Sequence, residues 1–162
     1  MAFSPELTEI ASRVGARLKE RGETVAVADG SAGGLISAAL LAVPGASAYF
    51  VGGAVLYTTN SKQTFLGLTR EEATEPRSST EPHTLMLARK IRERLGTTWG
   101  LAETGAAGPS GNRYGDAAGH ACLAYAGPSE RAITIETADS NRPANMDAFA
   151  RAALGLLSEA LG

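Results

Sequence analysis

The segment from Val25 to Leu35, VAVADGSAGGL, places the strongest constraint on the fold of this 162-residue chain. Four apolar residues, VAVA, precede a glycine-rich run, DGSAGG, and an apolar helix-like segment then continues to Val43. This succession is typical of a buried strand, a tight turn and a helix. Such a turn presents backbone N–H groups and the positive end of a helix dipole, which suit an anion or a developing oxyanion.

Ser31 lies within this turn, and the pattern leaves three roles open to it. It can act as a nucleophile, form hydrogen bonds, or cap the helix that follows. Asp29 can likewise be only a turn residue. The glycines match neither the dinucleotide fingerprint nor the P-loop, so neither of these phosphate sites is supported.

Hydrophobic periodicity and capping residues predict that helices and strands alternate along the whole chain. The order predicts an α/β fold, a three-layer α/β/α domain with a mixed, mostly parallel central sheet, and a single domain over residues 1–162. Residues 69–79 read as a connection with at most one helical turn. Helices are expected at residues 5–21, 35–43, 60–68, 81–95 and 143–161, and strands at 25–28, 48–58, 98–102, 118–126 and 132–138, the last two as an antiparallel hairpin.

The composition fits a globular protein, with 44% hydrophobic and 20% charged residues. Fifteen basic and seventeen acidic residues give a net charge of −2, which argues against a nucleic-acid partner. Cys122 is the only cysteine, so a disulfide within the chain and a multi-cysteine metal site are excluded. The first residues lack the pattern of a signal peptide, and no apolar run is long enough to cross a bilayer. We therefore expect a cytoplasmic protein without a membrane partner.

A second glycine-rich segment at residues 104–115 follows another strand. The carboxyl ends of parallel strands gather at one edge of a sheet, where ligands bind. If both glycine-rich segments lie at this edge, they bring together four polar side chains, Ser31, Tyr57, Lys62 and Thr104. Each also has a purely structural interpretation. Ser31 can cap a helix, Tyr57 can be a half-buried strand residue, Lys62 can be a solvated helix residue, and Thr104 can bind the backbone of its own loop.

Catalysis by a serine needs a group that accepts the hydroxyl proton. His83, in the first turn of a helix, and His120, within a strand, do not suit a Ser-His arrangement. A lysine can serve instead, as in Ser-Lys enzymes, if burial or a nearby cation lowers its pKa. Lys62 is the lysine that the pattern offers, and no spacing of His, Asp or Glu indicates a metal site.

Several stretches jointly resemble the CinA C-terminal domain family. Residues 28–53, ADGSAGGLISAALLAVPGASAYFVGG, are similar to the family's AESCTGGL motif, its PG-S-S-A-type segment and its aromatic strand. LYTTNSK at 56–62 resembles YSNEAK, with tyrosine and lysine at the same separation, and TEP at 80–82 stands where the family has SEE or SEP. ETGAAGPSG at 103–111 is similar to TGIAGPDGG, and Arg142 matches the arginine of a GDR motif. The resemblance covers nearly the whole chain in the same order.

This resemblance implies a nicotinamide-nucleotide amidase, which hydrolyses nicotinamide mononucleotide to nicotinic acid mononucleotide and ammonia. It implies a Ser-Lys site without metal or cofactor, and a homo-oligomer, a dimer by family precedent. Many relatives carry a further N-terminal domain, and the resemblance here is to the stand-alone form. By carry-over, Lys62 is the base, Tyr57 relays or orients a proton, and Thr104 is a polar partner of the serine or substrate. Arg142 meets the phosphate, and the glycine-rich turns bind substrate through Gly30, Gly33, Gly34, Gly105, Ala106 and Gly108.

The chain departs from the family motif where the nucleophile belongs. Alignment of the paired glycines puts Gly30 at the position of the nucleophilic serine, and Ser31 at the position of the cysteine that follows it. Two hypotheses result. In one, Ser31 replaces the missing serine and the chain is an amidohydrolase. In the other, the chain is a catalytically lapsed relative that binds a nucleotide or a partner protein.

Overall fold

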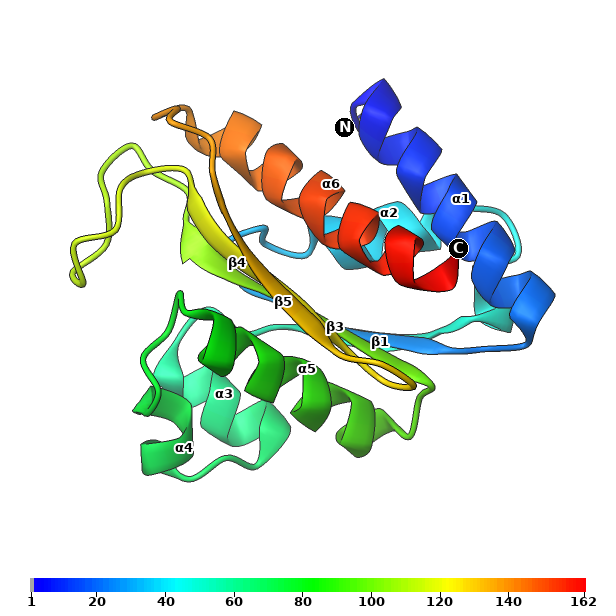
Figure 1. Cartoon of the computed structure of the whole chain (residues 1–162), viewed down its shortest axis with the longest axis horizontal. Helices are drawn as coiled ribbons and strands as arrows, with labels where there is room; N and C mark the ends of the chain where they lie inside the picture. The colour runs from blue at the N-terminus through cyan, green and yellow to red at the C-terminus, as the bar shows by residue number, and fades with distance from the viewer. Residues whose placement is uncertain (1) are drawn as a thin grey trace.

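The computed structural model describes residues 2–162 and arranges them in three layers (Figure 1). A five-stranded sheet forms the middle layer, with α1, α2 and α6 on one face and α3, α4 and α5 on the other. The α/β/α prediction is confirmed. The helices are α1 (Pro5–Arg21), α2 (Leu35–Leu41), α3 (Thr59–Leu66), α4 (Arg70–Thr74), α5 (Glu81–Leu95) and α6 (Arg142–Leu161), and the strands are β1 (Val25–Asp29), β2 (Phe50–Val55), β3 (Trp99–Ala106), β4 (His120–Ala126) and β5 (Arg131–Glu136).

The sheet is mixed, with the strand order β2-β1-β3-β4-β5. β1 pairs in parallel with β2 and with β3, whereas β3–β4 and β4–β5 are antiparallel. The predicted hairpin of the last two strands is therefore confirmed. Since β1, β2 and β3 run in the same direction, their carboxyl ends meet at one edge of the sheet, and this edge carries the turn at residues 29–34.

The side chains of β1 alternate between two hydrophobic cores. Val25 and Val27 pack in the core formed with α1, α2 and α6, and Ala26 and Ala28 pack in the core formed with α5. All five residues of the strand are buried. This explains why β1 is a continuous apolar run, as is usual for a parallel strand with helices on both faces. Packing on both sides fixes where the turn leaves the sheet.

The predicted helix boundaries rest on capping residues that the structure confirms. Ser4 Oγ accepts a hydrogen bond from the Leu7 N–H at 3.2 Å, and α1 ends at Gly22 in the left-handed conformation. Thr80 caps α5 in the same way as Ser4 caps α1. No helix within residues 2–162 is long and apolar enough to span a membrane.

One segment differs from the sequence prediction in a way that affects the site. β3 extends to Ala106, because it pairs with β4 as far as Ala106 and His120. Thr104, Gly105 and Ala106 therefore belong to a strand and not to the glycine-rich loop. The connection at 69–79 agrees with the prediction: it contains the single helical turn α4, followed by an irregular segment that leads to Thr80. The other boundaries move by a few residues, and a short 3-10 helix, Ala46–Ala48, precedes β2.

Candidate functional site

A pocket opens at the edge of the sheet where β1, β2 and β3 end. It consists of an outer cavity of about 520 Å³ and an inner recess of about 60 Å³. Five residues line both parts: Tyr57, Lys62, Ser78, Ser79 and Gly105. The recess additionally reaches Gly30, Ser31 and Thr104, so the structure brings together the four polar side chains that the sequence predicted to meet. They come from the ends of three strands and from the beginning of α3.

The N–H groups of the turn are largely satisfied within the protein. Glu103, on β3, is fully buried, and its Oε2 accepts hydrogen bonds from the N–H groups of Gly30 at 3.1 Å and Ala32 at 2.8 Å. Its Oε1 accepts a hydrogen bond from the Ser31 hydroxyl. The prediction that this turn offers its N–H groups to an external anion is therefore wrong for these two donors, because a carboxyl group of the chain already occupies them.

A second carboxyl group, Asp29, caps the helix that follows the turn. It accepts hydrogen bonds from the Ile36 N–H at 3.3 Å and from the Ser37 hydroxyl at 2.9 Å. The cap predicted for Ser31 is thus provided by Asp29. Burial raises the pKa of Asp29 to about 6 and the pKa of Glu103 to about 7, although their hydrogen bonds act in the opposite direction. The turn is therefore closed around two of the chain's own acids.

Lys62 forms the opposite wall of the pocket. Its side chain is only 4% exposed, and its Nζ lies 2.7 Å from Ser78 Oγ and 2.9 Å from His83 Nε2. Among residues 2–162 no carboxylate forms an ion pair with this ammonium group, and burial lowers its pKa to about 8. A lysine with these properties is neutral often enough near pH 8 to accept a proton. It forms no hydrogen bond with Ser31 within the described residues, so the predicted Ser31–Lys62 pair is not in direct contact.

His83 holds Lys62 from the protein side. Its Nδ1 lies 2.8 Å from the Pro76 carbonyl oxygen, which only accepts, so Nδ1 carries the proton. Burial lowers the pKa of His83 to about 4, with a further contribution from the nearby Lys62 charge. The ring is therefore neutral at physiological pH, and Nε2 accepts a hydrogen bond from Lys62. The sequence analysis set His83 aside as a partner of serine, and the structure places it beside the lysine instead.

Tyr57 and Arg142 lie together at the rim. Tyr57 is 62% exposed, and its hydroxyl oxygen accepts a hydrogen bond from Arg142 Nη2 at 3.0 Å. Arg142 also donates to the Gly108 carbonyl oxygen, which ties α6 to the segment after β3. Five predicted substrate-binding residues do not line either part of the pocket: Gly33, Gly34, Ala106, Gly108 and Arg142, the last of which reaches it only through Tyr57. Gly34, with φ +96°, instead shapes the turn before α2.

Comparison with known proteins agrees with this architecture. Residues 7–161 match the CinA C-terminal domain. The chain belongs to the CinA family. A CinA-like protein of Synechocystis sp. is 41% identical over 133 residues, 82% of this chain and 32% of that protein, and one of Salinibacter ruber is 36% identical over 141 residues, 87% and 34%. The chain thus spans about a third of the length of these relatives.

Solved structures extend the CinA comparison to the whole fold. The competence/damage inducible protein CihA of Agrobacterium tumefaciens has a TM-score of 0.90 and 29% identity, covering 99% of this chain and 98% of that one. A CinA superfamily protein of Enterobacter cloacae has a TM-score of 0.88 at 23% identity, covering 100% and 95%, and it supports the fold alone.

Gly30 occupies the position at which the CinA motif has serine, and the structure shows why a side chain does not fit there. A Cβ atom on Gly30 would lie 2.5 Å from the Glu103 carbonyl oxygen, a backbone atom that cannot turn away. Ser31 follows, but it is 7% exposed and its hydroxyl is directed to Glu103. The turn of this CinA-family chain therefore offers an open nucleophile at neither Gly30 nor Ser31.

The segment before α5 contains the functional residues that the sequence analysis missed. Ser78 contacts Lys62, and Ser79 has φ +61°, a left-handed conformation that is rare outside glycine. Thr104 Oγ1 accepts a hydrogen bond from the Ser79 N–H at 3.2 Å and contacts Thr84 Oγ1 at 2.8 Å, rather than Ser31. The run of two serines before a capped helix is the only sequence signal for this segment, and it is a weak one.

Proposed function

We propose that this chain is a metal-independent amide hydrolase of the nicotinamide-nucleotide type, which releases ammonia from nicotinamide mononucleotide with Lys62 as the general base. One observation carries this proposal. A buried lysine that forms no ion pair within the described part of the chain lines a pocket, and its pKa is lowered to about 8. A general base is most effective when its pKa is close to the working pH.

The pocket provides the other features that a nucleotide amide requires. Its volume of about 520 Å³ lies within the range of small-molecule sites. Tyr57, Arg113 and Tyr114 line the outer cavity, and the exposed ring of Tyr57 offers an aromatic surface for a pyridine ring. Arg113 supplies a cationic group within the pocket for a phosphate, and Arg142 supplies another at the rim.

Ammonia release from nicotinamide mononucleotide by purified protein tests this function. We expect Lys62→Met to reduce the rate by about 10²–10⁴-fold, the usual contribution of a general base. The variant should remain folded, because methionine suits a buried site. Lys19→Met changes an exposed lysine on α1 and serves as the matched control. The proposal is overturned if the wild-type protein releases no ammonia, or if Lys62→Met retains full activity.

A second function is favoured by the closed turn. Glu103 fills two N–H donors that would otherwise stabilise an oxyanion, which suits a relative that binds a nucleotide without hydrolysing it. Calorimetric titration with nicotinamide mononucleotide distinguishes the two functions. Binding without ammonia release supports the binding protein, whereas turnover excludes it.

A further inference from the structure

Ser78 is the hydroxyl group in direct contact with the base of the proposed site. Its Oγ lies 2.7 Å from Lys62 Nζ, and its side chain lines both the outer cavity and the inner recess. We propose that Ser78, on the segment before α5, is the nucleophile of this site and takes the role that the CinA motif assigns to the position of Gly30. This inference rests on the proposed hydrolase function and names the residue that attacks the substrate.

The hydrogen-bond pattern around Lys62 leaves a suitable acceptor for Ser78. A neutral amine has two N–H bonds and one lone pair. One N–H bond donates to His83 Nε2, which accepts because Nδ1 donates to the Pro76 carbonyl oxygen. With this hydrogen bond fixed, the lone pair can turn to Ser78 Oγ and accept its proton. His83 is thus a positioning residue for the base, and it does not contact Ser78 itself.

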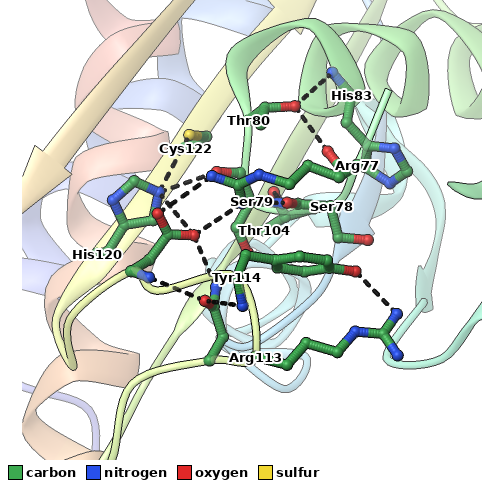
Figure 2. Close-up of polar contacts among 12 residues, drawn as sticks. Arg77, Ser78, Ser79, Thr80, His83, Thr104, Arg113, Tyr114, His120 and Cys122 are labelled. Atoms are coloured by element: carbon green, nitrogen blue, oxygen red, sulfur yellow. Dashed lines mark hydrogen bonds and ion pairs between the residues drawn. The ribbon is translucent and has the colours of Figure 1, made fainter. Parts of the chain in front are cut away.

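Contacts on both sides of Ser78 fix its backbone (Figure 2). Before it, Arg77 forms an ion pair with Asp116 at 2.8 Å. After it, the carbonyl oxygen of Ser79 accepts a hydrogen bond from His120 Nε2 at 2.9 Å, and the Ser79 N–H donates to Thr104. The left-handed Ser79 persists because these contacts hold it. Strained residues of this kind concentrate at active sites, where they aim a neighbouring side chain.

Ser31 is the competing nucleophile, and the shape of the pocket decides against it. Its hydroxyl donates to Glu103, a carboxyl group that is completely buried. The recess that Ser31 lines measures about 60 Å³, against about 520 Å³ for the outer cavity. Ser31 lines the recess alone, whereas Ser78 lines the recess and the outer cavity, where there is space for a substrate of nucleotide size.

The reaction follows from these positions. Ser78 Oγ attacks the carbonyl carbon of the amide, and its proton passes to Lys62 Nζ. The C–N bond then breaks as Lys62 returns this proton to the leaving nitrogen, which departs as ammonia and leaves an ester on Ser78. Water attacks the ester while Lys62 accepts a proton from it. Ser78 leaves with that proton, and the carboxylic acid product is released.

An alkyl fluorophosphonate identifies the activated serine without depending on the natural substrate. The serine oxygen bonds to phosphorus and fluoride leaves. Digestion with trypsin separates the two possible sites, since Ser78 lies in the peptide 78–89 and Ser31 in the peptide 22–62. We expect an adduct on Ser78 of the wild-type protein, its loss in Ser78→Ala and Lys62→Met, and its retention in Ser129→Ala, a control in the exposed turn between β4 and β5.

Mapping on the wild-type protein remains decisive even if Ser78→Ala fails to fold. An adduct on peptide 22–62, or no adduct, overturns the assignment. Ammonia release separates this inference from the proposed function. If nicotinamide mononucleotide is hydrolysed, Ser78→Ala should lose on the order of 10³-fold or more in rate. If the variant instead keeps the wild-type rate, the assignment of Ser78 as the nucleophile is overturned and the proposed hydrolase function is retained. If Ser78 is labelled but no ammonia is released, the assignment of Ser78 as the nucleophile is supported and nicotinamide mononucleotide is excluded as the substrate.

Discussion

The turn at residues 29–34 and the Lys62 wall face each other across one recess, yet they treat buried charge differently. In the turn, Glu103 accepts two N–H groups and a hydroxyl, and Asp29 caps α2. Every donor that these acids bind belongs to the chain. On the opposite wall, the hydrogen-bond partners of Lys62 among residues 2–162 are the neutral Ser78 and His83, and Lys62 lines the pocket. The turn is therefore organised for stability, and the Lys62 wall retains a group that can react.

This difference also predicts opposite responses to pH. Burial raises the pKa of Glu103 to about 7 and lowers the pKa of Lys62 to about 8, because in both cases the charged form is disfavoured. The neutral acid is the form that the folded protein prefers, and the neutral amine is the form that catalysis needs. Raising the pH should therefore lower the stability of the turn, where Glu103 ionises, and increase the fraction of neutral Lys62 on the opposite wall.

Among the effects that test this comparison of the two regions, the largest is the pH dependence of the rate. Between pH 8 and pH 6 the neutral fraction of a lysine with a pKa of about 8 falls from about half to about 1%, so kcat/KM should fall roughly 50-fold. Ammonia release in overlapping buffers at constant ionic strength measures this profile. The residual rate of Lys62→Met should not show this fall between pH 8 and pH 6. A flat wild-type profile between pH 6 and pH 8 would contradict the assignment of Lys62 as the base.

The next effect concerns the position of the family's nucleophile. Gly30→Ser should lower the free energy of unfolding by about 1–3 kcal/mol, because its Cβ would lie 2.5 Å from the Glu103 carbonyl oxygen and β3 would have to move. We also expect no gain in ammonia release. Urea denaturation provides the measurement, and Gly155→Ser provides the control, since a Cβ there is 3.5 Å from Ile10 and fits. A stable, more active Gly30→Ser would show that the turn can still carry the nucleophile.

The sequence predicts one of these two regions better than the other. Lys62 could be placed at the pocket because strand and helix patterns are local, and the caps at Ser4 and Thr80 identify where helices begin. The closure of the turn could not be predicted. Glu103 is 72 residues from Ser31 along the chain, and their contact depends on the register between β1 and β3.

Ser78 was missed for a different physical reason. It lies in an irregular segment, where no periodicity indicates which way a side chain points. Its position is set by long-range contacts of its neighbours, Arg77 with Asp116 and Ser79 with His120. His83 was set aside as a partner of serine because it lies in the first turn of a helix, whereas the structure places it beside Lys62. Both residues depend on tertiary contacts that a single sequence does not contain.

A further effect should appear in the pH dependence of the stability of the turn. The pKa of Glu103 is raised above its unfolded value, so its contribution to stability is complete below about pH 4.5 and is lost as the pH rises through about 7. Glu103→Gln keeps an acceptor for the N–H groups and does not ionise. The free energy of unfolding of the wild type should fall between pH 5 and pH 8, and that of Glu103→Gln should not. The difference between variant and wild type should therefore shift in favour of the variant by on the order of 2–3 kcal/mol over this range.

Urea denaturation at the two pH values measures this change for Glu103→Gln. Glu20→Gln, an exposed residue on α1, provides the control and should follow the wild type at both pH values. If Glu103→Gln is less stable than the wild type by the same amount at pH 5 and pH 8, the carboxyl group does not titrate in this range. The stability of the turn would then not depend on pH through Glu103, contrary to the comparison of the two regions.

The smallest expected effect distinguishes the rim from the reactive wall. Tyr57 is exposed and its hydroxyl accepts from Arg142, whereas no hydrogen bond joins it to Lys62 within residues 2–162. Tyr57→Phe should therefore raise KM about two- to fivefold, the value of one solvent-exposed hydrogen bond, and leave kcat nearly unchanged. Tyr114→Phe, in the same outer cavity, removes a similar contact with Arg113 at 2.9 Å and is the matched comparison. A large loss of turnover in Tyr57→Phe alone, with KM unchanged, would instead make Tyr57 a proton relay, and the reactive region would then extend from Lys62 to the rim.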